Sequence, residues 1–153
     1  IEHEVSHLPI NMSYLVKSYM KKDVPTIEDN ASATETAKAM SKTGSGYIII
    51  LKNRQPVGIV TERDFVNKII ARELDPVKVS IGEIMSSPII TVDPDEDLLK
   101  ASEIMQKHNI RRLPVVRGGI IYGIITARDI AQGCISYVDK ATREIIKWSS
   151  FGI

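Results

Sequence analysis

The feature of this sequence that most restricts its fold is an internal repeat. When the chain is aligned with itself at a shift of 65 residues, without gaps, five identities fall within a window of seven residues. In that window Gly58, Ile59, Thr61, Arg63 and Asp64 coincide with Gly123, Ile124, Thr126, Arg128 and Asp129. Upstream, in the same phase, Met20, Thr26 and Met40 coincide with Met85, Thr91 and Met105. Two copies are too few for a solenoid, so the sequence predicts a tandem pair that shares an interface.

Each copy is predicted to contain an amphipathic helix with recognisable ends. The first helix has a capping box in Ser32–Glu35, and the second is expected to begin at Pro94, directly after Asp93. Gly44 and Asn109 are the expected C-terminal stops. The residues predicted to face the core are Ala33, Ala37 and Met40 in the first helix and Leu98, Ala101 and Met105 in the second.

Short apolar runs surround these helices and predict strands. The runs lie at 25–27, 47–51 and 57–60 in the first copy and at 89–92, 113–116 and 122–125 in the second. The second and third runs of each copy are apolar at nearly every position, which is typical of strands buried on both faces. A second helix is expected to start at Thr61 and at Thr126. Each unit is therefore β-α-β-β-α, and the predicted fold class is α/β (α+β).

The repeats divide the chain into five predicted parts. They are an N-terminal extension (1–15), a first repeat (16–71), a linker (72–80), a second repeat (81–136) and a C-terminal helical extension (137–153). The last helix carries an apolar stripe at helical spacing: Ile130, Cys134, Tyr137, Val138, Ala141, Ile145 and Trp148. Cys134 is expected to lie in the core. The stripe either packs on its own chain or, with Trp148 and Phe151, forms a dimer surface.

Composition excludes several classes of protein. The chain has 20 basic and 19 acidic residues, so a general electrostatic grip on nucleic acid is not expected. Its single cysteine allows neither an internal disulfide nor a cysteine-based zinc site. It has neither a membrane-spanning apolar run nor a signal-peptide core, so we expect a cytoplasmic protein without membrane contact. Ile1 stands where a start methionine would be, which leaves open whether residues precede it.

Two further patterns could indicate metals. His3-Glu4-Val5-Ser6-His7 matches the H-E-x-x-H signature of zinc proteases. Pro9 disfavours helix just beyond it, and chain ends fray, so we expect no zinc catalysis and no metal site. The acidic stretch 93–97 is expected to serve capping and solvation, with magnesium binding as the weaker alternative.

The repeated Thr-x-x-Asp motif supports two interpretations. Thr61 with Asp64, and Thr126 with Asp129, fit a capping box at a helix N-terminus, which alone would account for them. The same geometry suits a nucleotide, because a helix N-terminus attracts phosphate and a carboxylate can accept hydrogen bonds from ribose hydroxyls.

The chain resembles the cystathionine β-synthase (CBS) domain family, as a stand-alone pair of prokaryotic type. That family's repeats contain the pattern Gly-h-h-Thr/Ser-x-x-Asp, where h is apolar, and the resemblance covers Val16–Ala71 and Ile81–Ser136. His108–Val116 is similar to the family's basic-Leu-Pro-Val-Val strand, and Ile84-Met85 followed by Ile90–Val92 fits as well. The resemblance implies two small three-stranded sheets packed together, helices outside, and two ligand clefts related by a pseudo-twofold axis.

The resemblance also implies which residues would line each cleft, and we name the two sets after their aspartates. The Asp129 site would comprise Thr126, Asp129, Arg128, Arg112, Met20, Pro25, Gly46 and Tyr47. The Asp64 site would comprise Thr61, Asp64, Arg63, Met85, Ile90 and Arg111. Arg112 in the second copy aligns with Tyr47 in the first, so the Asp129 site is expected to bind a charged nucleotide more tightly.

The resemblance implies a regulatory, non-catalytic protein. We expect a sensor that binds AMP, ADP or ATP, with S-adenosylmethionine less favoured because of the arginines. The alternative is a ligand-free structural or protein-interaction module with degenerate clefts. A homodimer shaped as a flat disc of four repeats is expected, together with an unknown regulated protein partner. No Ser-His-Asp set, paired carboxylates or P-loop indicates an enzyme.

Overall fold

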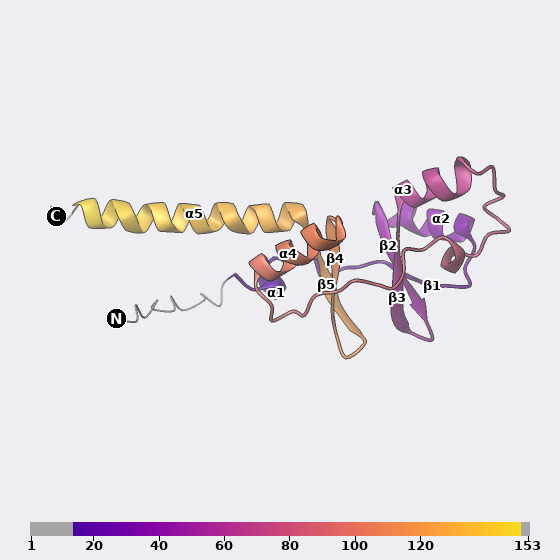
Figure 1. Ribbon diagram of the computed structural model, residues 1–153, viewed down its shortest axis with the longest axis horizontal. Helices are drawn as coiled ribbons and strands as arrows, with labels where there is room; N and C mark the ends of the chain where they lie inside the picture. The colour runs from indigo at the N-terminus through magenta and orange to yellow at the C-terminus, as the bar shows by residue number, and fades with distance from the viewer. Residues whose placement is uncertain (1–13, 151–153) are drawn as a thin grey trace.

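A computed structural model describes residues 14–150, which form two units of similar build (Figure 1). The first repeat contains α1 (Val16–Tyr19), β1 (Thr26–Glu28), α2 (Ala33–Thr43), β2 (Tyr47–Lys52), β3 (Gln55–Thr61), α3 (Glu62–Phe65) and the π-helical segment η2 (Val66–Ile70). The second contains the 3-10 turn η3 (Ile81–Glu83), α4 (Leu98–His108), β4 (Arg112–Arg117), β5 (Ile120–Thr126) and α5 (Ala127–Ser150). The His3–His7 motif and Phe151 lie outside the described residues.

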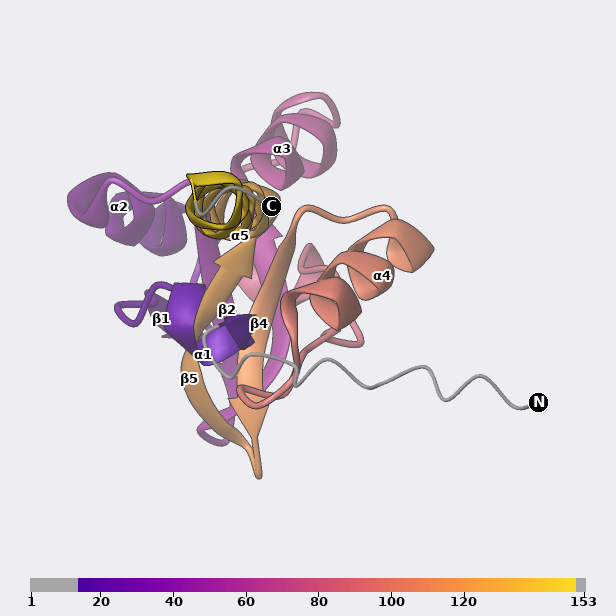
Figure 2. The same ribbon diagram turned by 90° about the vertical axis from the view of Figure 1, so that its left-hand side faces the viewer.

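The strands form two small sheets at the centre of the molecule, with helices around them (Figures 1 and 2). In the first sheet β1 pairs parallel to β2, and β2 pairs antiparallel to β3 with Tyr47 opposite Thr61. In the second sheet β4 pairs antiparallel to β5 with Arg112 opposite Thr126. The counterpart of β1 is only a parallel bridge from Val92 to β4. The mixed α/β class is confirmed. The β-α-β-β-α order is complete in the first repeat, and in the second repeat the strand predicted at 89–92 is reduced to this bridge.

The ends of the helices follow from local capping. The Ser32 hydroxyl accepts a hydrogen bond from the Glu35 amide at 3.0 Å, and the Glu35 carboxylate accepts one from the Ser32 amide at 3.0 Å, as predicted. Gly44 and Asn109 adopt the left-handed conformation at the C-caps of α2 and α4, also as predicted. These ends were predictable because capping involves residues only three or four positions apart.

The predicted start of α4 was wrong. The helix begins at Leu98 rather than at Pro94, because the Asp97 carboxylate accepts a hydrogen bond from the Lys100 amide at 2.8 Å and caps it. Asp97 is the repeat counterpart of Ser32, so the two helices start in register. The inner face of α2 also differs from the prediction, since Ala37 is exposed and Thr36 is fully buried in its place.

Each repeat has its own apolar core, and each core includes residues from the first turn of the other repeat. Val16 of α1 is fully buried with Leu98, Leu113 and Ile125 in the core of the second repeat. Its counterpart at a shift of 65 residues, Ile81 of η3, is fully buried in the core of the first repeat. The two repeats therefore exchange their opening turns.

Backbone hydrogen bonds hold the exchanged segments at the sheet edges. The Lys21 and Ile124 backbones exchange two bonds of 2.9 Å, so the stretch after α1 extends the β5 edge. The Ser86 and Ile59 backbones do the same at the β3 edge, with 2.9 and 3.2 Å. One edge of each sheet, at β3 and at β5, is thereby paired at one bridge, which reduces the backbone left open to pairing with other chains.

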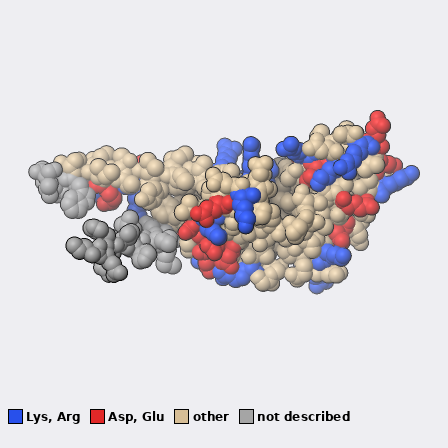
Figure 3. All heavy atoms as spheres, in the orientation of Figure 1, with Lys and Arg blue, Asp and Glu red and all other residues tan. Residues whose placement is uncertain are grey.

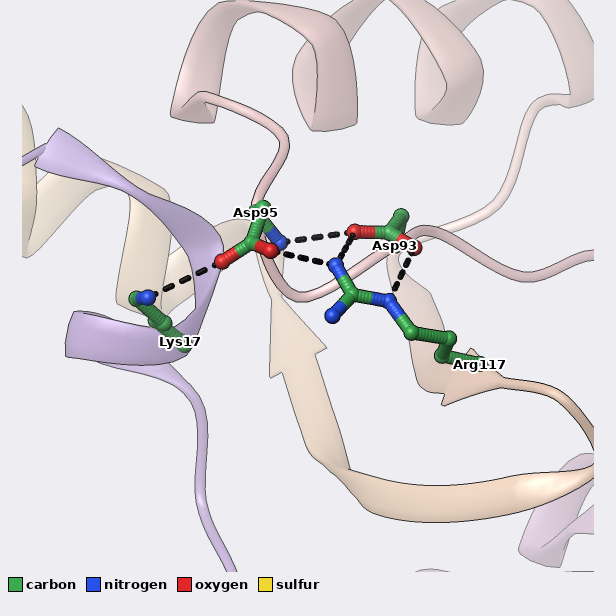
Figure 4. A network of polar contacts seen from close by, with 4 residues as sticks. All are labelled: Lys17, Asp93, Asp95 and Arg117. Carbon is green, nitrogen blue, oxygen red and sulfur yellow. Dashed lines mark hydrogen bonds and ion pairs between the residues drawn. The ribbon is translucent and has the colours of Figure 1, made fainter.

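A network of charged side chains fastens α1 to the second repeat (Figure 4). The Lys17 ammonium contacts the Asp95 carboxylate at 2.9 Å. The Arg117 guanidinium binds both Asp93, at 2.6 and 2.9 Å, and Asp95. Two carboxylates of the acidic stretch 93–97, those of Asp93 and Asp95, thus have internal cations as partners. The four side chains are between 39% and 50% exposed, so these ion pairs contribute only modestly to the stability of the fold.

The last helix, α5, extends well beyond the sheets (Figure 1). Near its start Gly133 is buried against Leu98 and Tyr19, and further along the Tyr137 ring packs edge-on against Tyr14 at 5.3 Å. Cys134 is exposed, so its predicted core position was wrong. The uncharged surface of α5 is broad (Figure 3). Among residues 14–150 there is no helix with the length and apolar character to cross a membrane.

Candidate functional site between the repeats

The two Thr-x-x-Asp motifs lie where a strand passes directly into a helix, β3 into α3 and β5 into α5. In each repeat the amide of the first helical residue donates to a carbonyl just before the neighbouring strand. The Glu62 amide donates to Gly46 at 3.1 Å, and the Ala127 amide donates to Arg111 at 2.9 Å. These bonds fix both helix starts against their own sheets and place Gly46 and Arg111 beside them.

At the Asp129 site the capping box is complete. One carboxylate oxygen of Asp129 accepts from the Thr126 amide at 2.9 Å and from the Thr126 hydroxyl at 2.9 Å. The Thr126 hydroxyl in turn accepts from the Asp129 amide at 3.2 Å. The second carboxylate oxygen has no hydrogen-bond or ion-pair partner among residues 14–150. Since a carboxylate can accept about four hydrogen bonds, Asp129 has acceptor capacity left for a ligand.

At the Asp64 site the same box is present, with one addition. Asp64 accepts from the Thr61 amide at 2.8 Å and from the Thr61 hydroxyl at 3.4 Å. Its other carboxylate oxygen contacts the Lys68 ammonium at 2.9 Å. The Lys68 ammonium also donates to the Ile84 carbonyl at 2.8 Å. The prediction from sequence missed Lys68, although its spacing of four residues from Asp64 on a helix was a signal for such a pair.

Arg112 and Tyr47 bring the two repeats together. They are repeat counterparts, and the Arg112 guanidinium carbon lies 5.6 Å from the centre of the Tyr47 ring. Counterparts that contact each other lie beside the pseudo-twofold axis, so this cation–π pair occupies the middle of the molecule. Burial raises the pKa of the Tyr47 phenol above its ordinary value, the charge of Arg112 opposes this, and the nearby Asp129 carboxylate adds to the rise.

Two methionines lie against glycines on the strands that carry the motifs. A side chain at Gly123 would come within 2.9 Å of the Met20 sulfur, and one at Gly58 would come within 2.6 Å of the Met85 sulfur. Each methionine therefore reaches the opposite repeat at the glycine three residues before the threonine of its motif. Sequence reasoning assigned Met20 to the Asp129 site and Met85 to the Asp64 site, and the structure places each beside the corresponding strand.

The remaining predicted site residues differ in their burial and contacts. Pro25 is half-buried, and its carbonyl accepts from the Ile49 amide at 3.0 Å. Arg63, Arg111 and Arg128 are exposed. Ile90 packs against the core of the second repeat. Whether these residues touch a ligand stays a prediction.

Two surface hollows lie elsewhere on the molecule. One, of about 280 Å³, lies between α4 and the start of α5 and is lined by Met105, Asn109 and Ile130 among others. The other, of about 580 Å³, lies beside η3 and is lined by Val57, Glu83 and Met85 among others. Of the predicted site residues only Met85 lines one of these two hollows. Among residues 14–150 no cluster of three or more His, Cys, Asp or Glu side chains is placed to hold a metal ion.

Comparison with known proteins identifies the family of the chain. The signature of the CBS domain matches residues 16–71 and 81–135. The chain is 31% identical to the CBS domain-containing protein YhcV of Bacillus subtilis over 121 residues, which cover 79% of this chain and 86% of that protein. It is 38% identical over 122 residues to an uncharacterized protein of Methanopyrus kandleri, covering 78% of this chain but only 62% of the relative.

Solved structures show the same arrangement. The hexameric CBS-CP12 protein from bloom-forming cyanobacteria is 31% identical and superposes with a TM-score of 0.70, covering 76% of this chain and 70% of that one. An uncharacterized conserved protein from Pyrococcus horikoshii, 23% identical, shares the fold with a TM-score of 0.72 over 82% of this chain and 95% of its own. With the duplicated motif, the paired small sheets and these matches together, the chain belongs to the CBS domain family and contains a pair of CBS domains.

Proposed function

We propose that this CBS pair is a regulatory module that binds an adenine nucleotide, AMP, ADP or ATP, at the Asp129 site. The observation that carries the proposal is the convergence of three groups from two repeats. Asp129 has a carboxylate oxygen without a partner among residues 14–150, Arg112 supplies a cation from β4, and Tyr47 supplies a half-buried ring from β2.

Each of these groups suits one part of the ligand. The free oxygen of Asp129 can accept hydrogen bonds from ribose hydroxyls. The N-terminus of the 24-residue helix α5, with the Thr126 hydroxyl and Arg112, favours phosphate. Met20 and the backbone at Gly46 provide the apolar and hydrogen-bonding surroundings for a base. The arginines favour phosphorylated ligands over S-adenosylmethionine.

The proposed role is regulation in the cytoplasm rather than catalysis. A ligand that touches both repeats alters their relative orientation only as far as it binds one orientation better than the other. The protein that would read this change remains unknown. We also propose that the chain works as a homodimer.

The competing proposal is a structural or protein-interaction module without a ligand. One observation favours it: both capping boxes have their threonine and aspartate groups hydrogen-bonded within the chain. Capping is therefore a sufficient reason for those residues to be present, and the two proposals differ only in whether a nucleotide binds.

Thermal unfolding with each of AMP, ADP, ATP and S-adenosylmethionine at ~1 mM separates the two proposals. A nucleotide with a dissociation constant near 10 μM would be at ~100 times that value and would stabilise the fold by about 2.7 kcal/mol. For a chain of this length the melting temperature should rise by roughly 5–10 °C.

The matched variant is Asp129→Ala, which should abolish the nucleotide-induced rise while costing only about 0.5–2 kcal/mol of stability from the lost cap. No rise with any of the four ligands would favour the interaction module, and the search would turn to protein partners.

A further inference from the structure

We infer that Lys68 closes the Asp64 site, so that the chain takes one nucleotide, at the Asp129 site, rather than two. This inference rests on the proposed nucleotide binding and specifies its stoichiometry. It concerns a residue outside both predicted site sets.

The Lys68 side chain reaches from the first repeat to the second. Its ammonium contacts Asp64 at 2.9 Å and the Ile84 carbonyl at 2.8 Å. Asp64 is the residue that would accept the ribose hydroxyls, and Ile84 directly precedes Met85, which would contact the base. The ammonium therefore lies between the aspartate that would hold the ribose and the segment that would hold the base.

The ion pair between Lys68 and Asp64 is partly shielded from water. The Asp64 side chain is only 13% exposed and that of Lys68 31% exposed, so water screens the pair less than it screens the surface pairs of the chain. With Thr61 on one oxygen and Lys68 on the other, the Asp64 carboxylate is neutralised and largely occupied. A nucleotide at this site would have to break the ion pair and leave the Lys68 ammonium without its carboxylate partner.

The second repeat has no lysine at the position equivalent to Lys68. The counterpart of Lys68 at a shift of 65 residues is Gly133, which has no side chain to reach Asp129. A Cβ atom there would lie 2.4 Å from the Leu98 Cδ1 atom, so any side chain at this position would require Leu98 to move. Among residues 14–150 the Asp129 carboxylate therefore lacks the internal cation that Asp64 has.

Two further differences act in the same direction. Glu62 adds a carboxylate to the first turn of α3, where α5 has Ala127, and a negative charge there disfavours phosphate. The first helical turn at the Asp64 site also belongs to a short helix, since α3 has four residues before the chain turns π-helical. By contrast α5 continues for 24 residues.

The test is a set of calorimetric titrations with the best nucleotide from the thermal-unfolding experiment. The wild-type chain should bind one equivalent, and Asp129→Ala should weaken binding on the order of 100-fold, since two hydrogen bonds to a charged group are lost. The double variant Lys68→Met/Asp129→Ala should regain binding through the vacated Asp64 carboxylate, and adding Asp64→Ala should remove it again.

The controls separate closure from a general effect on stability. Lys68→Arg retains the charge and should leave one site, and Lys107→Met makes the same side-chain change on the exposed face of α4. Each variant is first checked for a cooperative thermal transition. Methionine is chosen at position 68 because it keeps the aliphatic stem of the lysine side chain, which a shorter residue would remove.

Regained binding in the double variant supports the closure of the Asp64 site. Two equivalents bound by wild type, or no binding by a folded double variant, would overturn it while the proposed function stands. Retention of one tight site in Asp129→Ala would overturn both, since the nucleotide would then bind elsewhere. The absence of nucleotide binding in wild type and in every variant would overturn both.

Discussion

At the scale of single residues, charge pairing distinguishes positions that the repeat makes equivalent. Asp64 has an internal cation, whereas Asp129 has none among residues 14–150, although both cap a helix in the same way. Position 47 carries a tyrosine and position 112 an arginine, and these two counterparts meet at the pseudo-twofold axis. The duplicated backbone therefore carries two chemically different sites.

Charge pairing at Asp93 and Asp95 predicts how the fold responds to acid. Hydrogen bonds from Arg117 lower the pKa of both carboxyls, that of Asp95 to about 2. A lowered pKa in the folded state stabilises the fold above the ordinary carboxyl pKa near 4, and this contribution disappears as the pH falls toward about 2. Arg117→Ala should therefore shift the midpoint of acid unfolding to higher pH, as followed by circular dichroism.

The control for this prediction is Arg143→Ala, which removes an exposed ion pair with Asp139 on the distal part of α5. The acid midpoint of that variant should match wild type. An unchanged midpoint in Arg117→Ala would contradict a stabilising role of the network in Figure 4.

At the scale of elements, the exchange of opening turns connects the stability of one repeat to a segment of the other. The backbone amides at the start of each turn donate to the opposite repeat, Val16 to Glu96 at 2.8 Å and Ile81 to Ala31 at 2.7 Å. Both opening turns are held in the same way, and each completes the core of the opposite repeat. The two repeats therefore depend on each other for a complete core.

The exchange predicts that a substitution in α1 destabilises the second repeat. Val16→Ala removes two methyl groups from a fully buried position and should cost about 2 kcal/mol. Amide hydrogen exchange should then show lost protection first in α4, β4 and β5. The matched variant Ile81→Ala should lose protection first in α2, β2 and β3. Loss confined to residues 16–71 in Val16→Ala would contradict the exchange.

At the scale of the whole molecule, the helices after the two motifs leave apolar side chains uncovered. Ile70 at the end of η2 is 68% exposed and its counterpart Ile135 on α5 is 62% exposed. The segments α3 and α5 lie on the same side of the sheets (Figures 1 and 2). We propose that the homodimer covers these exposed isoleucines with a second copy of the chain.

This proposal predicts the mass of the protein in solution. Light scattering should give twice the chain mass of 17.0 kDa for wild type. Ile70→Asp/Ile135→Asp should give a monomer, because each change would bury an unpaired carboxylate in the interface. Leu99→Asp, at an equally exposed site on α4, should remain dimeric. A wild-type mass of 17.0 kDa would contradict the dimer.

The sequence by itself determined the features that depend on neighbours along the chain. The repeat, the Ser32 and Thr126 capping boxes and the C-caps at Gly44 and Asn109 were predictable, because each depends on residues a few positions apart. The family and the paired small sheets also followed, since the Gly-h-h-Thr-x-x-Asp pattern occurs twice.

Only the tertiary structure decided which repeat each opening turn completes and how the two sites differ. Val16 is apolar in either location, so its burial in the second repeat depends on long-range packing that a local pattern does not encode. The error at Pro94 arose because Asp93 and Asp97 stand four residues apart. The Asp97 carboxylate caps the helix, whereas the Asp93 carboxylate pairs with Arg117. The asymmetry at Lys68 depends on the Ile84 carbonyl, which reaches it from the other repeat, whereas a side chain at Gly133 would require Leu98 to move.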